Sequence, residues 1–169
     1  MSEPVFVPAC SVSGSGPPLL LLNGYAATHA DWDPAFLGEL GAHAQVLAAD
    51  HRGMGDSPRG DGPTSVEGLA RDALALLDAR ELERVDVAGW SMGGMVAQAL
   101  AALAPERVRR LVLLSTDPGG PEAVLADPDV WARLIDHGGT PREQATRILD
   151  LLFPAPLAAD LDAQVGELV

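Results

Sequence analysis

Cysteine and basic residues are scarce in this sequence. Cys10 is the single cysteine, and 11 Lys and Arg stand against 24 Asp and Glu in 169 residues, a net charge of −13. One cysteine excludes an internal disulfide and offers no metal-binding cluster, so we interpret Cys10 as a small apolar packing residue. Nucleic-acid binding needs clustered Lys and Arg, which this balance excludes. We expect no metal, no cofactor and no nucleic-acid partner.

Signals for export and membrane insertion are also missing. The start, Met1 to Pro4, lacks the basic residues and long apolar core of a secretory signal. One uncharged stretch, Val87 to Ala104, reaches 18 residues, which approaches the length of a membrane span. It contains Ser91, Gln98 and three glycines, however, and a buried strand followed by a buried helix explains it better. We therefore expect a cytoplasmic protein with no membrane partner.

The most informative stretch is Gly89-Trp90-Ser91-Met92-Gly93, a Gly-x-Ser-x-Gly motif. A β-rich run, Val85 to Ala88, precedes it, and a helix-forming run to Ala104 follows it. This context predicts a sharp strand-to-helix turn that lifts a nucleophilic serine hydroxyl clear of a sheet. The two glycines are expected because a Cβ at either position would collide with the neighbouring strand or helix. The alternative is a glycine-rich βα turn with an incidental serine.

The rest of the first 116 residues alternates between strand and helix signals. Apolar runs predict strands at Leu19–Leu22, Gln45–Ala49 and Val108–Leu114, and a remnant strand at Val5–Val7 before turn material at Ser11–Gly16. Helices are expected over Trp32–Leu40, from an N-cap at Thr64 to about Ala79, and from Met92 to a stop at Pro105. Inward positions of the last helix are Met95, Val96, Ala99, Leu100 and Leu103.

This alternation predicts an α/β fold, a parallel sheet with helices on both faces. Ligands of such sheets bind beyond the carboxyl ends of the strands. Three loops meet that edge here, and they begin at Asn23, at Asp50 and at Ser91. We expect the functional site to lie among these loops.

The pattern changes after Thr116. A hinge-like loop at 117–121 precedes three expected helices, one from Asp127 to Gly138, one from a capping box at Thr140 to Pro154, and one over Leu157–Leu168. No strand signal follows. We assign residues 1–117 to the core and residues 118–169 to the start of a helical cap.

Three motifs together resemble the α/β-hydrolase superfamily, in particular small bacterial enol-lactonase-like, esterase-like and cofactor-free haloperoxidase-like serine hydrolases. They are Leu19–Gly24 with Trp32 downstream, Asp50–Ser57, and Gly89–Gly94, and their order and spacing match as well as their letters. The resemblance covers about Ser13 to Thr116 well and the helical remainder loosely. Three ordered motifs disfavour the incidental serine.

The resemblance implies roles for several residues. Ser91 is the expected nucleophile, and the backbone N–H groups of Tyr25 and Met92 are the expected oxyanion donors. Asn23 stands where the family often has His. The expected oxyanion donor is a backbone N–H, so this change of side chain need not abolish it. Trp90 and the Tyr25 side chain have two possible roles. They either line the substrate pocket or serve only as packing residues. The Asp50–Ser57 segment, with Asp50, Arg52 and Asp56, resembles a structural loop of the family, so these residues are not expected to be catalytic.

The chain departs from the family where the acid and base of the triad should stand. The family order is Ser, then Asp or Glu, then His after the last strand, and this chain ends within the expected cap. We therefore expect an N-terminal fragment. His137 is the only histidine after Ser91, and with Asp117 it forms the one compact triad that the sequence offers. The alternative for His137 is a favourable charge at a helix C-terminus.

Two functions follow from these residues. The first is hydrolysis of a small-molecule carboxylic ester or lactone through a Ser91 acyl-enzyme, inactive or nearly so without a base from elsewhere. The second is a non-catalytic module that binds a ligand or a partner. The Val108–Leu114 strand is expected to be an unprotected apolar edge, which favours self-association or pairing with a complementing C-terminal chain.

Overall fold

The computed structural model describes residues 6–60, 64–121, 123–124, 126–136 and 138–166. The chain divides into two compact units, residues 1–123 and 124–169. The first unit holds a five-stranded sheet in the order β1-β3-β2-β4-β5. Its strands are β1 Cys10–Ser13, β2 Pro18–Leu22, β3 Gln45–Ala49, β4 Val85–Trp90 and β5 Val108–Leu114. Strands β2 to β5 pair in parallel, which confirms the predicted α/β architecture, and β1 adds an antiparallel edge.

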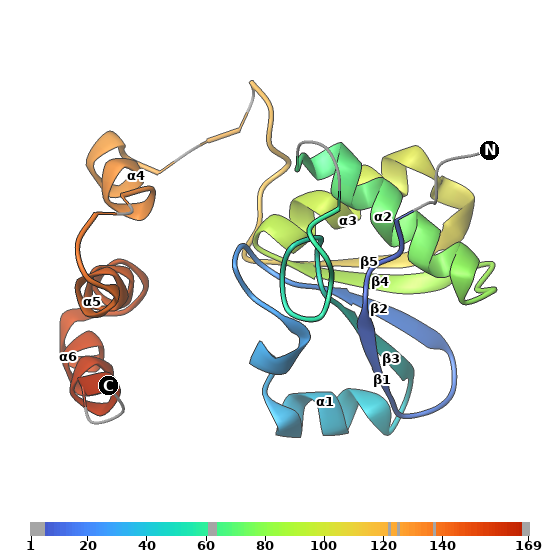
Figure 1. Ribbon diagram of the computed structural model, residues 1–169, viewed down its shortest axis with the longest axis horizontal. Helices are drawn as coiled ribbons and strands as arrows, with labels where there is room; N and C mark the ends of the chain where they lie inside the picture. The colour runs from blue at the N-terminus through green and yellow to red at the C-terminus, as the bar shows by residue number, and fades with distance from the viewer. Residues whose placement is uncertain (1–5, 61–63, 122, 125, 137, 167–169) are drawn as a thin grey trace. The chain divides into compact units, whose positions relative to one another are not determined.

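Helices cover both faces of this sheet (Figure 1). Helices α2 Val66–Ala79 and α3 Met92–Leu103 lie on one face, and α1 Pro34–Gly41 lies on the other. Short 3-10 turns stand at η1 His29–Asp31 and η2 Pro105–Arg107. The four-leucine run of β2 serves both faces, because Leu20 and Leu22 pack toward α2 and α3 while Leu21 packs toward α1. A strand buried on both faces explains the continuous apolar run.

Strand β5 lies at the edge of the sheet, and its last four residues are apolar. Its backbone pairs only with β4 among the described residues. All four of these apolar side chains are exposed, at Leu111, Val112, Leu113 and Leu114. The expectation of an unprotected apolar edge is therefore confirmed.

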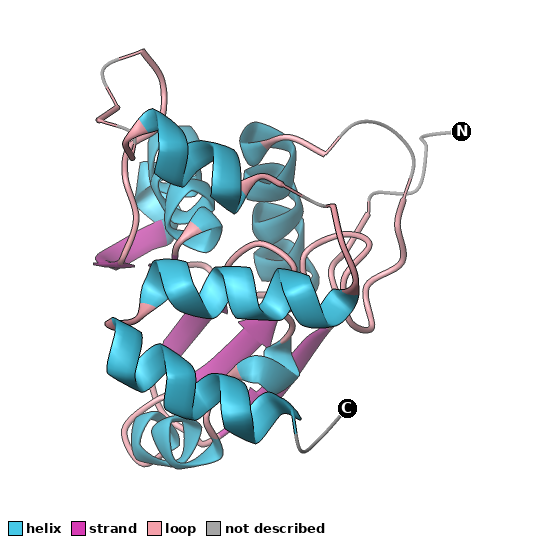
Figure 2. Cartoon of the chain, turned by 90° about the vertical axis from the view of Figure 1, so that its left-hand side faces the viewer, coloured by secondary structure: helices cyan, strands magenta, loops and turns pink. Residues whose placement is uncertain are grey.

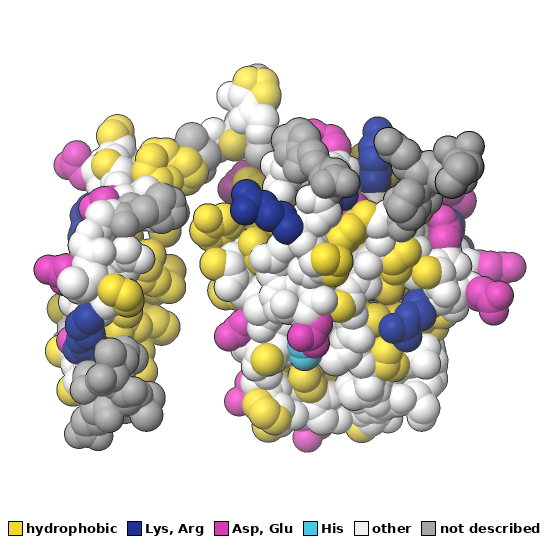
Figure 3. Space-filling view, viewed as in Figure 1, with side chains coloured by type: hydrophobic (Ala, Val, Ile, Leu, Met, Phe, Trp, Pro, Cys, Tyr) yellow, Lys and Arg dark blue, Asp and Glu magenta, His cyan; other side chains and the backbone are white. Residues whose placement is uncertain are grey.

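The second unit contains three helices, α4 Pro128–Leu134, α5 Pro141–Leu152 and α6 Ala155–Gly166 (Figure 2). The predicted capping box at Thr140 is confirmed, because Thr140 and Glu143 satisfy each other's backbone N–H groups. Asp162 ties α6 to α5 by accepting hydrogen bonds from the Arg142 guanidinium and, at 2.6 Å, from the Thr146 hydroxyl. Hydrophobic side chains gather along one side of this unit in Figure 3. Its exposed apolar residues are Val124, Val130, Trp131, Leu134, Ile135, Leu152, Phe153 and Leu157.

Three expectations near the N-terminus are wrong. The first strand is Cys10–Ser13 instead of the predicted Val5–Val7. Phe6 and Val7 have no strand structure, and Val5 is outside the described residues. The segment predicted as turn, Ser11–Gly16, therefore begins as strand, because an edge strand of small polar residues has no apolar run to reveal it. Trp32 precedes its helix, since Asp33 caps α1 with Pro34 at the first helical position.

Three further boundaries or faces differ from the prediction. The N-cap of α2 is Ser65 rather than Thr64, because the Ser65 hydroxyl accepts the Gly68 N–H at 3.1 Å. Leu103 is exposed and Ala97 is buried, because the inward stripe of α3 follows positions 93, 96, 97 and 100. Helix α4 ends at Leu134, where the Ile135 N–H bonds back to Trp131, rather than at Gly138.

Candidate functional site

Ser91 occupies a strained turn between β4 and α3. Its backbone has φ 53° and ψ −123°, a conformation that costs a non-glycine residue about 1–3 kcal/mol. The end of β5 and the segment that follows it hold both the N–H and the carbonyl of Ser91. The Ser91 N–H donates to the Leu114 carbonyl at 2.9 Å, and the Thr116 hydroxyl donates to the Ser91 carbonyl at 2.7 Å. The turn is therefore over-determined by its surroundings, as strained functional turns are.

The two glycines of the motif are required by close packing, as predicted. A Cβ on Gly89 would lie 2.3 Å from the Gly93 carbonyl oxygen, and a Cβ on Gly93 would lie 2.2 Å from the Leu22 carbonyl oxygen. These contacts bring the first turn of α3 against the ends of β4 and β2. The segment after β2 is thereby placed beside the serine, since a Cβ on Gly24 would lie 3.4 Å from the Ser91 Cβ.

The two expected oxyanion donors lie on these two neighbouring segments. Met92 is the first residue of α3, where a backbone N–H has no partner within the helix. Neither the Met92 nor the Tyr25 N–H has a backbone acceptor in the described part of the chain. The positive end of the helix dipole adds to the pull on an anion beside Ser91. The Tyr25 side chain is 68% exposed.

The Ser91 hydroxyl makes no hydrogen bond within the described residues. Of the histidines, His29 bonds Asp50, His51 bonds the Asn23 carbonyl, and His43 is exposed. His137 is outside the described residues, so its predicted pairing with Ser91 stays a prediction. The described residues therefore place Ser91, the expected nucleophile, beside the segments that carry the expected oxyanion donors, and no described histidine bonds to Ser91.

Asp117 follows the Ser91-holding Thr116 directly. Its carboxylate accepts the Gly119 N–H at 2.6 Å, and its carbonyl accepts the side-chain amide of Gln98 at 2.9 Å. Gln98 also donates to the Gly94 carbonyl at 3.2 Å, so it links α3 to the segment after β5. These bonds fix Asp117 as a turn residue close to the elbow, with its role in a triad still a prediction.

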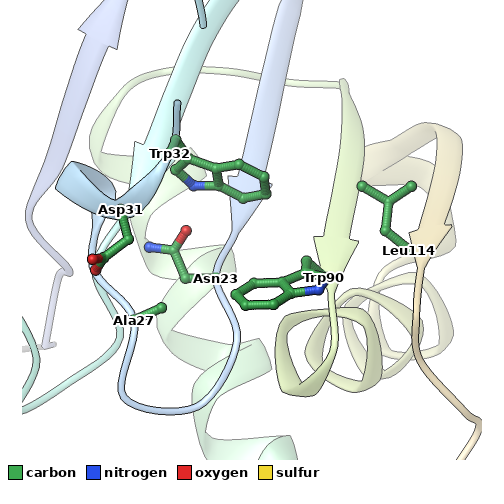
Figure 4. Close-up of a pocket in the computed structure, with 6 residues that line it drawn as sticks. All are labelled: Asn23, Ala27, Asp31, Trp32, Trp90 and Leu114. Atoms are coloured by element: carbon green, nitrogen blue, oxygen red, sulfur yellow. The ribbon is translucent and has the colours of Figure 1, made fainter. Parts of the chain in front are cut away.

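A cavity of about 250 Å³ opens beside the elbow (Figure 4). The rings of Trp32 and Trp90 and the amide of Asn23 turn toward this space. The remaining lining residues are Ala27, Asp31 and Leu114. Trp90 also packs edge-on against Trp32, with ring centroids 6.5 Å apart, so it both lines the cavity and packs. The Trp32 indole N–H is buried without a partner among the described residues.

A polar network around Asp50 was not predicted from the sequence as part of the site. The Asp50 carboxylate is wholly buried and accepts from the His29 N–H at 2.6 Å and the Asp56 N–H at 2.9 Å. Its second oxygen also lies 2.8 Å from His29 Nδ1. Burial opposes ionisation of Asp50, but these hydrogen bonds outweigh it and hold the pKa of the carboxyl below its usual value.

The pKa values of the two histidines in this network, His29 and His51, shift in opposite directions. The hydrogen bond to Asp50 raises the pKa of His29. Burial lowers the pKa of His51, whose Nε2 lies 2.9 Å from the Asn23 carbonyl oxygen. Ligand atoms of His29, Asp50 and Asp56 lie within 4.8 Å of one another, as metal ligands would. Hydrogen bonds already occupy the Asp50 oxygens, which explains the cluster without an ion.

The sequence and the fold are similar to those of known hydrolases. A family model described as the alpha/beta hydrolase fold matches residues 17–160. The chain belongs to the α/β-hydrolase family. It is 34% identical over 157 residues to rhodomycin D methylesterase of Streptomyces sp. strain C5, with 89% of this chain and 51% of the relative covered. It is 39% identical over 108 residues to 2-hydroxymuconate semialdehyde hydrolase of Pseudomonas sp. strain CF600, with 62% of this chain and 38% of the relative covered.

Solved structures of hydrolases share this fold. A hydrolase from Pseudomonas aeruginosa PA01 superposes with a TM-score of 0.70 at 35% identity, over 92% of this α/β-hydrolase chain and 61% of that chain. The α/β-hydrolase chain thus spans between about a third and two thirds of the length of these three proteins. Within its described residues, no helix is long and apolar enough to cross a membrane.

Proposed function

We propose that this chain carries the nucleophile and the oxyanion donors of a serine hydrolase acting on a carboxylic ester or lactone. The observation that carries the proposal is the strained Ser91 turn, held by β5 and placed at the N-terminus of α3 beside Gly24. Strain of this kind persists where function needs it. Two relatives, a methylesterase and a semialdehyde hydrolase, support hydrolysis and differ in substrate.

In the proposed reaction, the Ser91 oxygen attacks the substrate carbonyl carbon while its proton passes to a histidine base. The carbonyl oxygen becomes an oxyanion, which the Tyr25 and Met92 N–H groups stabilise by hydrogen bonds. The carbon–oxygen bond of the ester then breaks, and the histidine returns the proton to the leaving alkoxide. Water adds to the acyl-enzyme by the same steps in reverse and releases the acid and Ser91.

We propose that the base is a histidine from outside this sequence. The described residues place no histidine on Ser91, and the relatives are longer than this chain. The compact alternative uses Asp117 and His137. In either case the helices of the second unit serve as the start of a cap, for which their exposed apolar side chains are suited.

A non-catalytic ligand- or partner-binding module is the second candidate. The free Ser91 hydroxyl and the cavity lined by Trp32 and Trp90 favour a binding site without chemistry. The exposed edge of β5 favours a partner chain or a second copy. Tight binding of a small ligand that Ser91→Ala leaves unchanged would favour this candidate.

A fluorophosphonate probe tests the first proposal directly. The purified 169-residue chain is treated with the probe, and labelling at Ser91 is followed by mass spectrometry with Ser91→Ala as the control. Labelling that His137→Ala abolishes supports the compact triad. Labelling that appears only after addition of a C-terminal chain from a related hydrolase supports a base from outside. A folded chain that stays unlabelled with such a complementing chain bound contradicts the proposed chemistry.

A further inference from the structure

The loop from Asn23 to His29, called here the 23–29 loop, carries the Tyr25 amide past Ser91. It contains little that would hold it in place by itself. One internal hydrogen bond, from the Ala27 N–H to the Gly24 carbonyl, is 3.3 Å long. Ala26 adopts a positive φ of 59°, which is unfavourable for a residue with a Cβ. The position of the Tyr25 N–H therefore depends on contacts that the loop makes elsewhere.

Two consecutive residues after β3 reach the two ends of this loop. At one end, the Asp50 carboxylate accepts the His29 backbone N–H and contacts the His29 ring. At the other end, His51 Nε2 lies 2.9 Å from the Asn23 carbonyl oxygen, so the ring donates to it in the matching tautomer. The Asn23 side-chain amide adds a third contact by donating to the Ala49 carbonyl at 3.0 Å.

Asp50 is itself fixed from the opposite side. The Asp56 N–H donates to its carboxylate, and the Ser57 hydroxyl donates to its carbonyl at 2.7 Å. Gly55 lies so close that a Cβ there would stand 2.2 Å from the carboxylate oxygen. The Asp50 side chain is thereby enclosed, and its position is transmitted to His29 with little freedom.

We propose that Asp50 and His51 are positioning residues that clamp the 23–29 loop at its two ends and so hold the Tyr25 N–H in place beside Ser91. The inference rests on the proposed function for its catalytic meaning, and on the contacts above for the clamp itself. Oxyanion donors act only when aimed within a few tenths of an ångström, so a loop held at one end loses much of its effect. Asp50 and His51 touch the loop and do not touch Ser91.

His29 makes the clamp responsive to pH. The groups that act on its ring are Asp50 from the end of β3, Asp56 from the following loop and Asp31 from η1, all acidic. A protonated His29 ring pairs with Asp50 as an ion pair, and a neutral ring keeps only a hydrogen bond. Deprotonation of His29 therefore weakens the Asp50 end of the clamp and leaves the His51 end unchanged.

The clamp is tested by NMR on the full chain, a readout independent of Ser91 chemistry. In the wild type, the Tyr25 amide signal should shift with pH at the same midpoint as the His29 ring. His29→Asn offers a neutral donor near the position of Nδ1, so the clamp should persist while this inflection disappears. The proposal is overturned if the Tyr25 amide signal does not shift at the pH midpoint of the His29 ring, or if the inflection persists in His29→Asn.

Hydrogen exchange of the 23–29 loop provides the second readout. Asp50→Asn and His51→Phe should each speed exchange at the hydrogen-bonded loop amides of Ala27 and His29 by about tenfold or more, since each removes a hydrogen bond that holds the loop. Asp56→Asn is the matched control, because the Asp56 backbone and not its side chain holds Asp50. If Asp50→Asn does not fold, His29→Ala removes the ring contact from a partly exposed position and gives the same comparison. Unchanged exchange in folded variants contradicts the clamp.

Fluorophosphonate labelling links the clamp to the proposed function. Asp50→Asn and His51→Phe should lower the maximal labelling rate of Ser91 by about 10–100-fold while the probe concentration for half-maximal rate stays the same. Unchanged labelling in a variant whose loop exchanges faster overturns the positioning role. A folded wild-type chain that stays unlabelled with the complementing C-terminal chain bound counts against the proposed function, and the NMR and exchange results then decide the clamp alone.

Discussion

Thr116, two residues beyond the end of β5, donates its hydroxyl hydrogen to the Ser91 carbonyl oxygen at 2.7 Å. The segment after the edge strand thus holds the strained elbow through a side chain, in addition to the main-chain bond from the Ser91 N–H to the Leu114 carbonyl at the end of β5. The methyl group of Thr116 also packs close to Gly94, where a Cβ would stand 2.5 Å away. This contact makes Thr116 a sensitive point for the geometry of the turn.

Removing the Thr116 hydroxyl should loosen the elbow. Thr116→Val leaves the Ser91 carbonyl without this donor and should cost about 1 kcal/mol or more of unfolding free energy. Thr116→Ser keeps the hydroxyl and loses only a methyl group, so it is the matched control. Urea unfolding measures both. Equal losses in the two variants would show that packing against Gly94, rather than the hydrogen bond, matters.

Gly93→Ala should be poorly tolerated. The new Cβ would meet backbone atoms of Leu22 and Asn23, which cannot move as a flexible side chain would. The expected loss is about 3 kcal/mol or more, at the upper end for overpacking. Gly38→Ala is the control, because Gly38 lies in α1 with no atom within 4 Å of the added Cβ. This control should gain about 0.5–1 kcal/mol of unfolding free energy from helix propensity. Thermal unfolding measures both variants. A Gly93→Ala variant that is as stable as the wild type would contradict the close packing at Gly93.

The ion pair between Arg52 and Asp72 should matter far more than exposed pairs. The Arg52 Nε donates to Asp72 at 2.6 Å and both side chains are largely buried, so this contact raises the pKa of Arg52. Asp72→Asn replaces the carboxylate that faces this largely buried guanidinium by a neutral amide and should cost about 3–5 kcal/mol. Arg133 and Asp150, 4.0 Å apart and about half exposed, form the comparison pair. Asp150→Asn should change the unfolding free energy by less than about 1 kcal/mol.

The unfolding free energy should depend on pH through both His29 and Asp50, with the His29 contribution lost as pH rises and the Asp50 contribution lost as pH falls. The raised pKa of His29 contributes stability that is complete below about 6.5 and is lost as pH rises through the folded value. The lowered pKa of Asp50 contributes stability that is complete above about 3.8 and is lost as pH falls through the folded value. His51 opposes His29, because its lowered pKa removes stability as pH falls below about 6.5.

The difference between wild type and His29→Asn isolates the first of these contributions. Unfolding free energies measured in urea from pH 4 to pH 9 should fall with rising pH in the wild type relative to the variant. The two curves should run parallel above the folded pKa of His29. Parallel curves over the whole range would mean that His29 does not gain stability from Asp50.

The sequence by itself determined the strands and the elbow. Apolar runs predicted β3 and β5 with their observed ends and β2 within one residue. For β2 and β3 the physical reason is that strands buried between helices must be apolar on both faces. The serine motif gave the turn, since only glycine fits where Gly89 and Gly93 meet neighbouring backbone. Strand β1 escaped, because small polar residues at a sheet edge leave no hydrophobic pattern.

The tertiary structure decided how the polar residues are used. Asp50 and His29 are 21 positions apart, and neither a period nor a spacing joins them until β2 and β3 pair in parallel. The sequence places Asp50 and His51 after a strand, but only the packed sheet turns them toward the two ends of the 23–29 loop. Hydrophobic patterning is local and can be read along the chain, whereas hydrogen bonds between loops depend on which strand ends become neighbours.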